Sequence, residues 1–119
     1  MLKCENCNAF MQKALQKSIM IGISTFSSKE DALSMIESLL HHKLIACGQI
    51  SSPVESIYLW KNQIKKEIEW KMTVKFPIGN QDIITNKIEE LHPYEKPQWI
   101  VSEIVTTDEY YQWVAGNCP

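Results

Sequence analysis

The sequence predicts an α+β domain in which one antiparallel sheet carries two helices. Residues 66–76 alternate between apolar and polar side chains, which is typical of an antiparallel strand with one buried face. Two segments, 28–43 and 80–91, carry apolar residues at helical spacing. Short apolar runs before and after these segments have the length of strands. Together these three observations predict a sandwich of one sheet and two helices.

The first strand and the first helix are predicted from adjacent segments. Residues 19–25 form an apolar run that is long enough for a buried strand. Ser27 and Glu30 then have the spacing of a capping box, in which each side chain bonds a backbone N–H at the start of a helix. The helix 28–43 is therefore expected to begin directly after the first strand.

A long hairpin is predicted in the middle of the chain. Residues 44–50 form a strand that ends before Pro53, and residues 54–60 pair with 66–76 across the turn 61–64. The tip of this hairpin is expected to reach beyond the core. Such ribbons commonly pair with another chain.

The last third of the chain completes the sheet. Helix 80–91 is expected to end at the loop 91–97, Leu-His-Pro-Tyr-Glu-Lys-Pro, because each proline restricts the residue before it. Residues 99–105 form the last strand, and Thr107 or Asp108 caps a short terminal helix. The order of the elements is therefore βαββαβ, which predicts a ferredoxin-like sandwich with an extended central hairpin and a C-terminal helix. We expect another subunit to cover the free face of its sheet.

Residues 1–18 are expected to be an extension outside the core, so that residues 19–119 form the domain. The extension contains Cys4 and Cys7, and two thiolates at this spacing can bind one zinc or copper ion. A structural zinc site needs four ligands, however, and the sequence has no second pair. The alternative is that both thiols are simply exposed.

Composition excludes several classes of protein. The chain has 119 residues with a net charge of -2, and its 12 positive residues are all lysines. The absence of arginine argues against nucleic-acid binding, because arginine is the usual bidentate partner of phosphates and guanine. No apolar run approaches the ~20 residues of a membrane span, and we find no secretory signal. We therefore expect a cytoplasmic protein whose four cysteines are reduced.

Two residues are candidate metal ligands, and each also has a purely structural interpretation. Cys47 lies in an apolar strand, where it either is a small buried hydrophobic residue or provides a thiolate for copper. His92 either caps the helix it ends or provides an imidazole ligand from its rigid loop. No nucleophile-and-base signature or phosphate-binding loop is present, so we predict no enzymatic activity.

The chain resembles the CutA family of divalent-cation tolerance proteins from about residue 19 to residue 113. The resemblance rests on Leu44-Ile-Ala-Cys47, Ser56-Ile-Tyr58-Leu-Trp60, Glu67, Lys75 and His92-Pro-Tyr-Glu-Lys-Pro97. It implies a trimer of ferredoxin-like subunits whose long hairpins lie along their neighbours, and a link to tolerance of copper and other divalent metals. Phe26 stands where the family often has a cysteine, which removes one soft ligand.

Our first hypothesis is a non-enzymatic homotrimer that binds divalent metal ions, copper above all, through Cys47 and His92. Residues expected in a cleft or interface between subunits are Tyr58, Trp60, Glu67, Lys75, Tyr94, Glu95 and Trp113. The alternative is a module similar to the PII-type signal proteins, which are trimers, with a small anionic ligand bound in the cleft between subunits. An enzyme is a third hypothesis, for which the sequence indicates no substrate.

Overall fold

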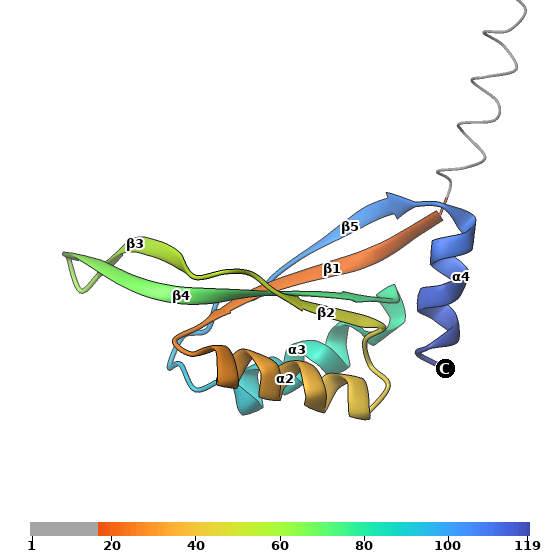
Figure 1. Ribbon diagram of the computed structural model, residues 1–119, viewed down its shortest axis with the longest axis horizontal. Helices are drawn as coiled ribbons and strands as arrows, with labels where there is room; N and C mark the ends of the chain where they lie inside the picture. Colours follow the sequence, from red (N-terminus) through yellow and green to blue (C-terminus); the bar gives the residue numbers. More distant parts are fainter. Residues whose placement is uncertain (1–16) are drawn as a thin grey trace, which may run out of the picture.

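The computed structural model describes residues 17–119 (Figure 1). Its elements follow the predicted order. They are β1 (Lys17–Phe26), α2 (Lys29–His41), β2 (Cys47–Ile50), β3 (Val54–Trp60), β4 (Gln63–Phe76), a short 3-10 helix (Ile78–Asn80), α3 (Gln81–Leu91), β5 (Ile100–Thr106) and α4 (Asp108–Gly116).

The strands form one antiparallel sheet in the order β2-β4-β1-β5, and β3 pairs with the remaining length of β4. Helices α2 and α3 lie on the same face of this sheet (Figure 1). The α4 helix lies at the end of the sheet that is far from the β3–β4 hairpin. This arrangement confirms the predicted ferredoxin-like fold, its extended hairpin and its C-terminal helix.

The core lies between the sheet and the two helices. Both predicted helical stripes contribute to it, because Ile36 and Leu39 of α2 and Ile84 and Ile88 of α3 are buried. Facing them are the alternate residues of β4 and the end of β1: Met72, Val74, Phe76 and Phe26. None of the helices described has the length and apolar character needed to cross a bilayer.

The alternation predicted for β4 is correct from Trp70 to Phe76 but wrong before it. Ile68, expected on the buried face, is 54% exposed, whereas Glu69, expected in solvent, is only 7% exposed. The reason is that β1 stops pairing with β4 at Trp70, so that β4 continues only as a ribbon with β3. No helix covers Ile68 there, and the loop after α3 covers Glu69 instead.

Several boundaries differ from the prediction. The strand expected at 44–50 begins only at Cys47, and the turn expected at 61–64 is only residues 61–62, because Trp60 already pairs with Gln63. Strand β1 begins at Lys17, two residues before the expected start of the domain. Helix α2 is capped by Ser28 rather than by Ser27, because the Ser28 hydroxyl accepts a hydrogen bond from the Asp31 backbone N–H at 3.1 Å. Cys4 and Cys7 lie outside the described residues, so their proposed metal site stays a prediction.

Candidate functional site

A cleft of about 690 Å³ lies between the β3–β4 ribbon and the loop that follows α3. One face of the ribbon lines it through Ser56, Tyr58, Trp60, Lys65, Glu67 and Glu69. These residues share a face because they alternate along two paired strands, with Ser56 opposite Glu67 and Tyr58 opposite Lys65. Across from them stand Pro93, Tyr94, Glu95 and Lys96 of the loop. The cleft thus brings together Tyr58, Trp60, Glu67, Tyr94 and Glu95, which were predicted to share a site.

Two hydrogen bonds between phenols and carboxylates organise this cleft. The Tyr58 hydroxyl donates to Glu67 Oε1 at 2.6 Å, and the Tyr94 hydroxyl donates to Glu69 Oε2 at 2.6 Å. The bond to Glu67 raises the pKa of Tyr58 above its ordinary value. The pKa of Tyr94 is also raised above its ordinary value, mainly by burial and in addition by the hydrogen bond to Glu69. Both phenols therefore stay protonated at neutral pH and hold the two carboxylates in fixed positions.

His92 is a buried part of the fold, with 7% of its surface exposed. Its Nδ1 accepts a hydrogen bond from the Tyr94 backbone N–H at 3.1 Å, so the ring proton is assigned to Nε2. Nε2 donates to the Thr25 carbonyl at 2.9 Å, and the ring stacks on Phe26 with centroids 4.3 Å apart. Both ring nitrogens are therefore engaged, and the imidazole fixes the loop to the end of β1.

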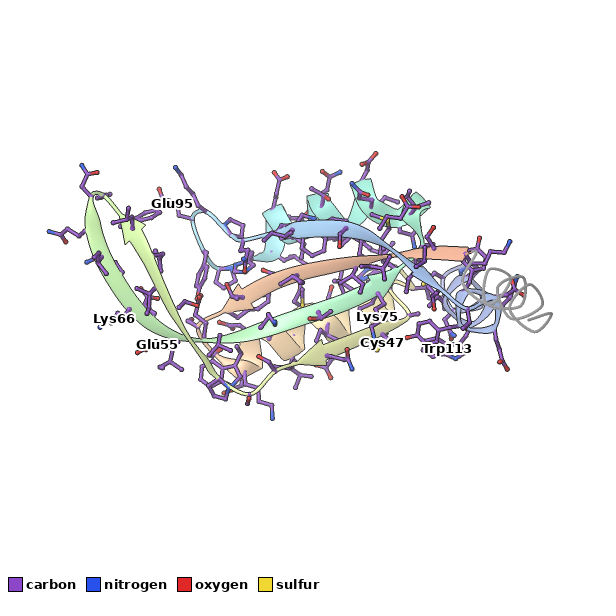
Figure 2. All side chains as sticks on the ribbon, turned by 90° about the horizontal axis from the view of Figure 1, so that it is seen from above. Cys47, Glu55, Lys66, Lys75, Glu95 and Trp113 are labelled. Carbon is purple, nitrogen blue, oxygen red and sulfur yellow. The ribbon has the colours of Figure 1, made fainter. Side chains whose placement is uncertain are left out.

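Cys47 lies far from His92. Cys47 pairs with Lys75 across β2 and β4, and Lys75 pairs with Ile21 of β1, whereas His92 bonds Thr25. Four residues of a strand span about 13 Å, so one ion cannot bind both side chains of a single chain. Figure 2 agrees, because Cys47, Lys75 and Trp113 lie toward one end of the molecule and Glu95 lies toward the ribbon.

The predicted metal ligands therefore do not form a complete site within one chain. Within residues 17–119, no group of three or more histidine, cysteine, aspartate or glutamate side chains is placed to hold a metal ion. Cys47 is partly exposed, as a ligand of an external ion would need to be. Lys75 and Trp113, predicted for a cleft or interface between subunits, lie away from this cleft, at the end of the molecule that carries Cys47. Their contact with another subunit stays a prediction.

Sequence reasoning missed Glu69, Lys65 and Lys96 as members of the cleft. A signal for the first two was available, because Lys65, Glu67 and Glu69 stand at alternate positions of one strand and therefore share a face. Glu67, which lies between them, was itself predicted for the cleft. Lys96 gave no comparable signal, because its position depends on how the loop folds back over the ribbon.

We predict that acid weakens the fold through His92. Burial lowers the pKa of His92 in the folded protein below its value in the unfolded chain, which is about 6.5. The unfolded chain then binds more protons than the folded protein at mildly acidic pH. The free energy of unfolding is therefore constant with respect to this group above about pH 6.5 and decreases as the pH drops below it. Urea unfolding at pH 7.5 and at pH 5.5, each about one unit from that value, should show this loss.

A His92→Gln variant provides the control, because it cannot titrate at this position. Its free energy of unfolding should change less between the same two pH values than that of the wild-type protein. Equal pH dependence in the two proteins would contradict the assignment of the effect to His92.

Comparison with known proteins gives one consistent family. A family model described as CutA1 divalent ion tolerance protein matches residues 20–117. The divalent-cation tolerance protein CutA of Escherichia coli (strain K12 / DH10B) is 23% identical over 107 residues, which cover 89% of this chain and 96% of the relative.

Solved structures of the same family share the fold. The CutA1 structure from Ehrlichia chaffeensis is 32% identical with a TM-score of 0.82, and the match covers 85% of this chain and 95% of that one. The periplasmic divalent cation tolerance protein CutA from Archaeoglobus fulgidus is 25% identical with a TM-score of 0.80, over 87% of this chain and 100% of that one.

Proposed function

This chain belongs to the CutA1 family of divalent ion tolerance proteins, and we propose that it acts as a homotrimer that binds metal ions, copper above all, without catalysing a reaction. The proposed location is the cytoplasm, where its four cysteines would stay reduced. The Archaeoglobus relative, in contrast, is named a periplasmic protein.

The observation that supports a homotrimer is the amount of apolar surface that the single chain leaves exposed. Ile100 and Ile104 of β5 are 54% and 41% exposed on the face of the sheet opposite α2 and α3. On the ribbon, apolar side chains are exposed on the face opposite the cleft: Ile57, Leu59, Ile64 and Ile68. Exposed apolar surfaces of this extent mark contacts with other chains, and closed symmetric assembly is their usual solution.

The copper proposal rests on Cys47. A thiolate is a preferred ligand of Cu(I), and this thiol is partly exposed beside Lys75. Because the described residues provide no complete site, further ligands would come from another subunit or from Cys4 and Cys7. We assign no ligand role to His92, because both of its nitrogens are already bonded within the fold.

Copper affinity of the reduced protein tests this assignment. Competition with a Cu(I) chelator should show that Cys47→Ser weakens copper binding by more than about 100-fold. Mutating residues that only hydrogen-bond to a metal ligand already lowers metal affinity by about 10- to 100-fold, so losing the ligand itself should have a larger effect. Cys118→Ser is the matched control, because Cys118 is buried at the C-terminus and should leave the affinity unchanged. Undiminished binding in Cys47→Ser, with loss in a protein that carries both Cys4→Ser and Cys7→Ser, would place the site in the N-terminal segment instead.

A second candidate function is a PII-like signalling module that binds a small anionic ligand. The cleft supports it in two respects, because its volume is in the range of small-molecule sites and because Lys65 and Lys96 line it. A ligand that binds only the folded state raises the melting temperature. A saturable rise with a nucleotide, and none with copper, would favour this candidate over the first.

A further inference from the structure

We propose that the cleft binds a small linear diamine or polyamine between Glu67, Glu69 and the aromatic rings beside them. This role is separate from the copper site, because Cys47 lies at the other end of the molecule (Figure 2). It also differs in charge from the anionic ligand of a PII-like module.

The first observation is the state of Glu69. Its side chain is 7% exposed and lines the cleft, and among the described residues its Oε2 accepts one hydrogen bond, from Tyr94, whereas its Oε1 accepts none. Because no buried side-chain oxygen of the described residues lacks a hydrogen-bond partner, Oε1 remains accessible from the cleft although most of the side chain is buried. An ammonium group in the cleft would therefore reach the one oxygen of Glu69 that Tyr94 does not occupy.

The second observation is a second carboxylate at a fixed distance. Glu67 stands two residues before Glu69 on the same face of β4, so their Cα atoms lie about 7 Å apart. The hydrogen bonds from Tyr58 to Glu67 and from Tyr94 to Glu69 join the four groups into one cluster. Tyr58 occupies only Oε1 of Glu67, and the other oxygen stays available as an acceptor. A diamine with a four-carbon chain separates its two ammonium groups by a comparable distance.

The third observation is the lining around these carboxylates. The rings of Tyr58, Trp60 and Tyr94 offer apolar surface to a methylene chain and negative π-faces to an ammonium group. The cleft contains three carboxylates, with Glu95 as the third, against the two ammonium groups of Lys65 and Lys96. Lys65 stands two residues before Glu67 on the same face of β4 and Lys96 lies in the loop, so the two ammonium groups flank the Glu67–Glu69 cluster.

Isothermal titration with 1,4-diaminobutane and spermidine tests the proposal. We expect saturable binding to the wild-type protein that weakens by about tenfold in Glu67→Gln and in Glu69→Gln, since each change removes one charge-assisted hydrogen bond to an ammonium group. Binding should weaken as salt is added. It should be weaker for 1-butylamine, which has one ammonium group, and unchanged in Cys47→Ser.

Glu55→Gln is the matched control. Glu55 lies on the same ribbon but on its opposite face, where it pairs with Ile68 (Figure 2). Equal weakening in Glu55→Gln would overturn the proposal, because it would mean non-specific attraction to an acidic ribbon. Absence of saturable binding, or binding of ATP in place of the amines, would overturn it as well. Since Glu67 is exposed, Glu67→Gln decides the outcome even if Glu69→Gln fails to fold.

Discussion

Replacing His92 with alanine is expected to lower the free energy of unfolding by about 3 to 4 kcal/mol. The change removes the bond to the Thr25 carbonyl, leaves the Tyr94 N–H without its acceptor and takes away the ring that stacks on Phe26. Because only 7% of the surface of His92 is exposed, water can replace little of what is lost. The loop would then no longer hold Tyr94 against Glu69.

Urea unfolding of metal-free protein measures this effect. His41→Ala is the control, because His41 lies exposed at the end of α2 and its loss should cost no more than about 1 kcal/mol. A small loss in His92→Ala would show that the ring is not needed for the fold. Copper affinity should be unchanged in any His92→Ala protein that folds.

Replacing Gly22 with alanine is expected to destabilise the protein by about 3 kcal/mol. An added Cβ would meet the indole of Trp99, with Cζ3 at 2.7 Å and Cζ2 at 2.9 Å, and with Cη2 closer still. The indole cannot easily move, because its Nε1 donates to the Thr85 hydroxyl at 3.0 Å and its ring stacks on Phe76. Without this contact, replacing a glycine within a strand by alanine would mildly stabilise the protein. The sign of the change in the free energy of unfolding therefore shows whether the clash exists.

Thermal or urea unfolding checks this prediction against Gly79→Ala. An added Cβ at Gly79 meets no atom within 4 Å, so that variant should differ from the wild type by less than about 1 kcal/mol. The double variant Gly22→Ala with Trp99→Phe should lose less stability than the two single changes summed, because the smaller ring relieves the overlap. Strict additivity would contradict the proposed clash.

The sequence predicted the fold because its local patterns agree with the final packing. The alternation from Trp70 to Phe76 and the helical stripes around Leu39 and Ile88 each report one buried face. The pattern failed at Ile68 and Glu69, where burial depends on which strands and loops lie alongside rather than on the strand itself. Strand periodicity gives the two faces of a strand but not what covers each face.

The cleft was partly predictable for the same reason. Tyr58 and Trp60 alternate on β3, and Glu67 alternates with Glu69 on β4, so a hairpin brings them to one face. The separation of Cys47 from His92 was not predictable in this way. It depends on the registers of β2 with β4 and of β4 with β1, which arise from long-range packing.

Native mass spectrometry of the reduced protein, with and without copper and zinc, tests the proposed function most directly. The protein used should carry Cys4→Ser and Cys7→Ser, so that any copper taken up is bound without these two thiols. We predict a trimer that takes up copper in multiples of three and loses this uptake when Cys47→Ser is added. A monomer, or a trimer that takes up no metal even when Cys4 and Cys7 are present, would contradict the proposal.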